Sequence, residues 1–232
     1  MTASYKQFCP VAMAAEILCT RWTMVLLREL VAGSTRFNDL RRGVPRMSTA
    51  LLSTRLKQLE EAGIIRQIPS DNPRSSHEYR LTEAGRDLKS VVESIGLWGQ
   101  RWGDTSLSLD NLDPSLLMWD MRRNLDTTPM PSSRRVIEFQ FRDRPPSERH
   151  WWLIVDPSDG VDLCSVDPGF DVDLYVSTPL RTMTSVWMGI STVTQEIDAA
   201  NMLVDGDGAL RRDMQTWLGL SPFAVEKNRL AS

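Results

Sequence analysis

The chain has 232 residues, with 27 Lys and Arg against 30 Asp and Glu, and a formal net charge of −3. This length allows one large domain or two ordinary ones, and 41% apolar residues is typical of a soluble globular protein. No apolar run approaches the ~20 residues that span a bilayer, and three unevenly spaced cysteines with two histidines suit neither a disulfide framework nor a zinc site. We therefore expect a cytoplasmic protein with no membrane partner, metal or cofactor.

Helical periodicity covers most of the first hundred residues. Apolar residues recur over Ala12–Leu30, with a break expected near Thr20–Trp22. A short helix is expected over Arg36–Arg42, and a third from Ser48 to Ala62. Ser48 is a suitable N-cap, and Gly63 is the expected left-handed stop.

The period then changes to that of a β-hairpin. Short strands are expected over Ile64–Ile68 and His77–Leu81, separated by a turn that begins at Pro69. A longer helix follows from Thr82 to about Trp102. Three helices followed by a hairpin predict a winged helix-turn-helix.

The third helix is the candidate DNA-reading element. Leu52, Leu56 and Leu59 give it a buried face, and small hydroxyl residues with one lysine lie on the outer face. Arginines around them would neutralise phosphates. The residues expected to contact DNA are Arg36, Ser48, Thr49, Ser53, Thr54, Arg55, Lys57, Arg74 and His77.

The long helix suggests dimerisation. Trp98 and Trp102 are four residues apart and share a face, and large aromatic side chains on one face of a terminal helix suit an interface. Packing on a second domain of the same chain is the alternative. The expected interface residues are Val11, Leu88, Val92, Ile95, Trp98 and Trp102.

The second half has a different pattern and charge. Residues 1–104 hold 15 Lys and Arg against 11 Asp and Glu, whereas residues 105–232 hold 12 against 19. Only the first half suits a polyanion, and we place the domain boundary after residue 104. Beyond it we expect an α+β domain with a mainly antiparallel sheet. Its helices are expected at Ser115–Asn124, Leu180–Met188, Thr194–Ala200 and Ala209–Leu218, and its strands at Ile137–Phe141, Trp151–Val155, Val161–Val166 and Phe170–Val176.

Several motifs of the first half stand in the order and spacing of one known family. They are Cys9-Pro10-Val11, Arg21-Trp22-Thr23, Leu27-Arg28-Glu29-Leu30, Arg36-Phe37-Asn38-Asp39-Leu40, Leu52-Ser53-Thr54-Arg55-Leu56, Leu59-Glu60-Glu61-Ala62-Gly63-Ile64-Ile65, Glu78-Tyr79-Arg80-Leu81-Thr82-Glu83-Ala84-Gly85 and Trp98-Gly99. Over residues 9–102 the chain resembles HxlR-type transcriptional regulators. The resemblance implies a winged helix that binds an inverted-repeat operator in double-stranded DNA as a homodimer. Two departures are Cys19-Thr20, where a Gly-rich pair is expected, and the hairpin tip 71–76, where many members have consecutive prolines.

The second half resembles a sterol carrier protein-type lipid-binding domain. The similar residues are Asp173-Leu174-Tyr175-Val176-Ser177, Trp187-Met188-Gly189 and Leu203-Val204-Asp205-Gly206-Asp207. The resemblance implies an apolar tunnel between a sheet and its helices, although the same side chains could simply fill a core. The candidate lining residues are Met118, Phe139, Phe141, Trp151, Met183, Trp187, Met188, Met214 and Trp217.

These patterns predict a dimeric transcription regulator that is modulated by an apolar small molecule. No catalytic motif is present in the sequence, so we do not expect an enzyme. One alternative is a redox-sensing regulator that acts through Cys9, because some HxlR-type regulators sense oxidants at this place and a helix N-terminus favours a thiolate. Another alternative is a lipid carrier whose helix-turn-helix serves protein interaction.

Overall fold

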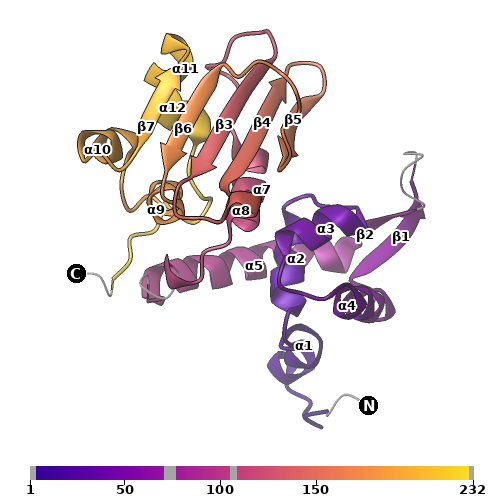
Figure 1. The fold of residues 1–232 in the computed structure, drawn as a ribbon. Coiled ribbons are helices and arrows are strands. Elements are labelled where there is room, and N and C mark those ends of the chain that lie inside the picture. Colours follow the sequence, from indigo (N-terminus) through magenta and orange to yellow (C-terminus); the bar gives the residue numbers. More distant parts are fainter. Residues whose placement is uncertain (1–3, 71–76, 105–108, 230–232) are drawn as a thin grey trace. The chain divides into compact units, whose positions relative to one another are not determined.

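The computed structural model describes residues 4–70, 77–104 and 109–229. The chain divides into two compact units, Met1–Gly96 and Leu97–Ser232, and each has a hydrophobic core of its own. The division falls inside the long helix α5 (Glu83–Trp102), which Figure 1 shows. The domain limit expected after residue 104 stays a prediction.

The first helical stretch consists of two helices. They are α1 (Pro10–Leu18) and α2 (Thr23–Val31), and they are bent by 85° at the expected break. At the bend Trp22 has a φ of 79°, a left-handed conformation that is rare for a bulky residue. Within the described residues no single helix combines the length and apolar character of a membrane span. The bent pair meets that test by length and composition only.

The next elements form a helix-turn-helix with a wing. Helix α3 (Phe37–Gly43) leads through a short turn into α4 (Thr49–Glu61). The predicted cap is confirmed, because the Ser48 hydroxyl accepts a hydrogen bond from the Leu51 amide at 3.3 Å. Gly63 has a φ of 69°, as the predicted left-handed stop requires. Strands β1 (Ile65–Pro69) and β2 (His77–Leu81) pair antiparallel to form the wing.

One leucine-rich core holds this first unit together. It joins buried side chains from α2, α3, α4, the wing and the first half of α5. Its members are Leu26, Leu27, Leu30, Leu40, Val44, Met47, Leu52, Leu56, Leu59, Ile64, Ile65, Tyr79 and Val92.

The second unit is built on a mixed sheet. Its strands are β3 (Arg135–Phe141), β4 (His150–Asp156), β5 (Gly160–Cys164), β6 (Leu174–Thr178) and β7 (Leu203–Gly206), in the order β5-β4-β3-β6-β7. Strands β3 and β6 are parallel, and the other neighbouring pairs are antiparallel. The expected α+β content is confirmed.

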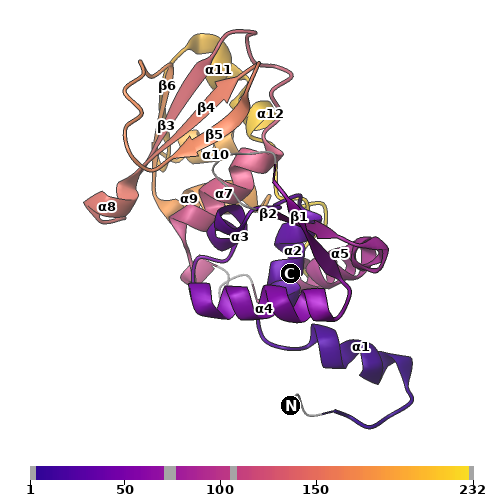
Figure 2. The same ribbon diagram turned by 90° about the vertical axis from the view of Figure 1, so that its right-hand side faces the viewer.

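Short helices cover one face of this sheet, as Figure 2 helps to follow. The covering helices contribute buried apolar side chains to the same core as β3, β4 and β6. The helices of this unit are α7 (Pro114–Asn124), α8 (Pro146–Arg149), α9 (Leu180–Trp187), α10 (Val193–Asp198), α11 (Gly208–Arg212) and α12 (Met214–Leu218), of which α8 adds no buried residue.

Three details differ from the sequence-based expectation. The fourth strand begins at Leu174 rather than Phe170, because its parallel pairing with β3 starts at Ile137. Strand β7 was not among the four expected strands. The helix expected over Ala209–Leu218 is two helices that meet at Asp213.

Candidate nucleic-acid interface

Helix α4 has one buried face and one face open to solvent. Leu52, Leu56 and Leu59 are at most 2% exposed and form the buried face. The residues predicted to face DNA from this helix, apart from Arg55, are exposed: Thr49, Ser53, Thr54 and Lys57. The structure therefore brings these four side chains together on the surface of one helix.

The hydroxyl groups of this exposed face are oriented along the helix. The Ser53 hydroxyl donates to the Thr49 carbonyl at 3.0 Å, and the Thr54 hydroxyl donates to the Ala50 carbonyl at 2.9 Å. A hydroxyl oxygen that donates once can still accept, so both groups can meet a donor on a base edge. Lys57 lies 3.7 Å from Glu61, an exposed i,i+4 pair that contributes little to stability.

Arg55, another expected DNA contact, makes hydrogen bonds within its own chain. Its Nε donates to the carbonyl of Arg21 at 3.1 Å, and its Nη1 donates to the side chain of Gln58. The guanidinium is thus used to tie α4 to the segment between α1 and α2. The DNA contact expected of Arg55 stays a prediction.

The remaining predicted DNA contacts surround α4 in sequence. Arg36 is exposed at the start of α3, with its Nε 3.6 Å from Glu78 on the wing. His77 is half-buried and lies 3.2 Å from the Tyr79 hydroxyl. Burial, and to a lesser extent the charge of Glu60, raises the pKa of Tyr79, so its hydroxyl stays protonated. Arg74 lies outside the described residues.

The predicted dimer residues divide into two groups. Val11, Ile95, Trp98 and Trp102 are exposed, by 76%, 50%, 65% and 41%. Trp102 also has a partner in its own chain, since the Arg229 guanidinium lies 5.5 Å from the ring centroid. The exposed apolar side chains Tyr5, Phe8, Met13 and Ile17 occur on or just before α1.

Val92 and Leu88 belong to the other group. Val92 is buried in the core of the first unit, and Leu88 packs against that core. A contact of these two residues with a second copy stays a prediction. At 100° per residue, the apolar residues of α5 from Leu88 to Trp102 form a stripe about 120° wide on the helix surface. The core of the first unit covers only the edge of this stripe that holds Leu88 and Val92.

The predicted ligand-lining residues all occur in one place, the core of the second unit. Eight of the nine are buried, and Met188 packs partly buried against them. Trp217 donates from its indole nitrogen to the Leu210 carbonyl at 2.7 Å, and Trp151 donates to the Glu148 carbonyl at 2.9 Å. These side chains are core residues in the structure, and a ligand role for them stays a prediction.

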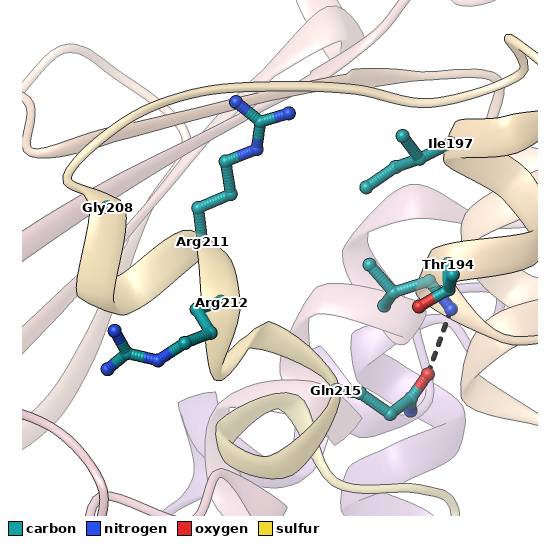
Figure 3. Close-up of a pocket in the computed structure, with 7 residues that line it drawn as sticks. Thr194, Ile197, Gly208, Arg211, Arg212 and Gln215 are labelled. Atoms are coloured by element: carbon teal, nitrogen blue, oxygen red, sulfur yellow. Dashed lines mark hydrogen bonds between the residues drawn. The ribbon is translucent and has the colours of Figure 1, made fainter.

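A pocket of about 310 Å³ lies instead among α10, α11 and α12 (Figure 3). It is lined by Val193, Thr194, Ile197, Gly208, Arg211, Arg212 and Gln215. The Gln215 side-chain oxygen accepts from the Val193 amide at 2.9 Å, and Arg212 bonds Asp213 at 3.0 Å. Sequence reasoning did not single out these residues, because three short helices supply them and no local pattern shows how those helices pack.

Cys9 occupies the N-cap position of α1 and is partly exposed. Cys19 is exposed at the end of the same helix. Cys164 is partly buried on β5.

The order of helices and strands over residues 23–81 defines a winged helix-turn-helix. A family model described as HxlR-like helix-turn-helix matches residues 17–107. An uncharacterized HTH-type transcriptional regulator of Mycobacterium tuberculosis is 42% identical over 94 residues, which make up 40% of this chain and 58% of that protein. The Bacillus subtilis protein YvaP, with the same description, is 36% identical over 95 residues, or 40% of this chain and 86% of its own length. The chain belongs to the HxlR-like helix-turn-helix family.

Solved structures match a similar share of the chain. The redox regulator HypR in its reduced form has 30% sequence identity and a TM-score of 0.39, over 43% of this chain and 99% of HypR. Reduced YodB from B. subtilis has 27% identity and a TM-score of 0.37, over 43% of this chain and 98% of YodB. The chain spans 58% of the length of the mycobacterial relative. The curated relatives are named as transcriptional regulators, and such proteins are not enzymes.

Proposed function

We propose that the chain is a sequence-specific, dimeric DNA-binding transcription regulator in which α4 reads bases in the major groove. The observation that carries this proposal is the exposed face of α4, where three hydroxyl groups and Lys57 lie opposite three buried leucines. Hydroxyl groups can donate to or accept from base edges, and a lysine can donate to guanine or to a phosphate. The leucines hold the helix on its core while the other face remains available.

Phosphate contacts would come from arginines around this helix. Three of them are exposed: Arg36 at the N-cap of α3, Arg46 on the turn before α4, and Arg66 on β1. Residues 1–104 carry more basic than acidic side chains, whereas residues 105–232 are acidic. A polyanion is therefore attracted to the winged-helix part of the chain and repelled by the rest.

The dimer is proposed to form through α1 and the exposed edge of α5. Nearly all of the nine residues of α1 lie outside the core, and only Ala12 is buried. Isolated exposed apolar residues are ordinary, but a run of them on one short helix marks an interaction site. A second copy is the favoured occupant because reading an inverted-repeat operator needs two identical units.

The second unit is proposed to bind a small effector. An apolar molecule with an anionic group would fit the pocket among α10, α11 and α12. Val193 and Ile197 supply apolar walls, and the seven lining residues include two arginines and no acid. This contrasts with the excess of Asp and Glu in residues 105–232. A lipid-carrier ancestry for this unit is a further proposal, supported by its helix-covered mixed sheet.

Direct tests distinguish this function from two alternatives, redox sensing through Cys9 and lipid transport. The partial exposure of Cys9 is compatible with redox sensing, and a Cys9→Ser variant that still loses operator binding on oxidation would remove that role. A lipid carrier with a protein-binding helix-turn-helix would bind no particular DNA sequence.

Selection from randomised duplexes by the full chain tests the proposal. We expect enrichment of two half-sites in inverted orientation, with centres about one helical turn (~34–36 Å) apart. A pool with no enriched sequence after repeated rounds would refute sequence-specific binding.

A further inference from the structure

A fully buried carboxylate lies beneath the turn of the helix-turn-helix. Glu29 on α2 is 0% exposed. Its Oε1 accepts from the Nε and Nη2 of Arg28 at 3.0 and 2.7 Å, and the Ser34 hydroxyl lies 3.5 Å from its Oε2. A buried charge is costly unless it is paired. Separating Arg28 from Glu29 would leave the Glu29 carboxylate buried without a cation, so the pair is expected to stay together.

The same ion pair holds the last residue of α3. Arg28 Nη2 also donates to the Gly43 carbonyl at 2.8 Å, which satisfies a carbonyl that the end of a helix leaves without an intrahelical partner. A Cβ added at Gly43 would lie 1.9 Å from Cδ and Oε2 of Glu29. The carboxylate therefore rests directly against the glycine backbone, and no larger residue fits without movement.

Gly43 is also the point from which the chain turns toward α4. Val44 and Met47 follow it as buried residues, the Met47 amide bonds the Val44 carbonyl at 2.9 Å, and Ser48 then caps α4. If the backbone at Gly43 moved, this short and tightly packed turn would move the start of α4 with it.

We propose that Arg28, Glu29 and Gly43 form an ionic clamp that fixes the position from which α4 reads DNA. The inference rests on the proposed function, and the three are positioning residues that do not touch DNA. Leucine packing around α4 is non-directional, whereas the bonds from Arg28 to Glu29 and to the Gly43 carbonyl have defined geometry. Replacing the pair by apolar groups could preserve stability and yet release the turn.

Two variants test the role of the charges. Glu29→Gln keeps the shape of the side chain but removes the charge that holds Arg28. Should that variant fold poorly, the double variant Arg28→Met, Glu29→Leu removes the bond to Gly43 without leaving a buried charge unpaired, and the Arg28 side chain it replaces is 29% exposed. For folded protein we expect affinity for a selected operator to fall by about 5- to 150-fold, the value of one good base contact. Affinity for a scrambled duplex and its salt dependence should not change, because phosphate contacts are sequence-independent.

A mutant cycle tests the contact itself. Gly43→Ala should lower the melting temperature and operator affinity. In the double variant Gly43→Ala, Glu29→Ala both losses should be smaller than the sum of the two single losses, because Glu29→Ala removes the atoms that the new methyl group meets. Gly208→Ala is the control for the melting temperature, which it should leave unchanged because a Cβ there meets nothing within 4 Å. Losses in the double variant that equal or exceed the sum of the two single losses would overturn the clamp.

Hydrogen exchange gives a readout that does not depend on DNA. In Glu29→Gln, the amides from Val44 to Leu52 should exchange faster, while those of β1 keep their protection. Unchanged exchange in this segment, or an unchanged ratio of operator to scrambled affinity in folded variants, would refute the inference. If the wild-type chain selects no DNA sequence, the proposed function fails. Hydrogen exchange and the melting temperatures of the mutant cycle would still show whether the clamp holds the turn, because neither measurement uses DNA.

Discussion

At the scale of single residues, Arg55 on α4 and Arg36 before α3 have different expected roles, the first in stability and the second in phosphate binding. Arg55 donates to the Arg21 carbonyl and to Gln58, whereas Arg36 is exposed and 3.6 Å from Glu78. We predict that Arg36→Ala reduces the slope of log affinity against log salt by about 0.9, the value of one phosphate contact. Arg55→Ala should leave that slope unchanged and lower the free energy of unfolding by about 0.5–1.5 kcal/mol. Equal slopes for both variants would contradict this assignment.

Asp156 is expected to make the stability of the second unit depend on pH in the acid range. Hydrogen bonds from the hydroxyl and amide of Ser158, and then from Arg134, lower its pKa from 3.8 to about 2. A carboxyl whose pKa is lower in the folded state stabilises the fold above its ordinary pKa, and this contribution is lost as the pH falls from about 4 to about 2.

The corresponding variant is Asp156→Asn. The difference in melting temperature between wild type and variant should be largest above pH 4 and shrink toward pH 2. Asp159→Asn, in the same turn, is the control for a general effect of removing a negative charge. A difference that stays constant from pH 5 to pH 2 would show that these hydrogen bonds do not act in this way.

At the scale of elements, α5 offers a matched test of the dimer. Ile95 on the exposed edge of α5 is 50% exposed, and Ile190 between α9 and α10 is 51% exposed. We predict that Ile95→Asp shifts the chain from dimer to monomer in light scattering at micromolar concentration, because an interface core excludes charge. Ile190→Asp should remain dimeric. A wild-type monomer, or equal behaviour of both variants, would refute an interface on α5.

The sequence predicted best those elements whose limits are set by local chemistry. Ser48 and Gly63 marked the ends of α4 because a cap and a left-handed glycine act within one turn of the chain. The period of α5 also placed Val92, Ile95 and Trp98 on one apolar stripe. The sequence could not show which edge of that stripe the core covers, and in the structure the covered edge includes Val92.

Long-range packing explains what sequence reasoning missed. The start of β6 depends on its pairing with β3, about 40 residues earlier in the chain, which no local pattern encodes. Nothing in the sequence indicated that Glu29 is buried, because charged residues are seldom buried. Its burial follows from Gly43, whose missing side chain leaves room for the carboxylate.

At the scale of the whole molecule, we expect an effector bound to the second unit to change the affinity of the chain for DNA. Decanoate is a suitable probe because it has an apolar chain and one carboxylate. We predict that it binds more tightly than decanol, and that Arg211→Ala weakens its binding by about three- to tenfold, between the values of a surface and a desolvated ion pair. Arg181→Ala, at an exposed arginine of α9, should bind as wild type does. Equal binding of decanoate and decanol would contradict an anion-selective pocket.

Such a ligand would regulate only if it favours one arrangement of the two reading helices in the dimer. A typical coupling of ~1–3 kcal/mol would change operator affinity by ~5- to 150-fold. Operator affinity measured with and without saturating decanoate checks this, and an unchanged value would limit the pocket to binding without regulation.

The central claim is that α4 reads DNA, and fluorescence anisotropy on a selected operator tests it most directly. The double variant Thr54→Ala, Lys57→Ala removes two side chains of the exposed face. The control Ser94→Ala, Lys89→Ala removes a hydroxyl that bonds back to its own helix and a lysine paired i,i+4 with Glu93 at 3.8 Å on α5. We predict that the first pair loses at least about 1–3 kcal/mol of operator discrimination and that the control keeps wild-type affinity. Equal operator affinity for wild type and the Thr54→Ala, Lys57→Ala variant would contradict the account.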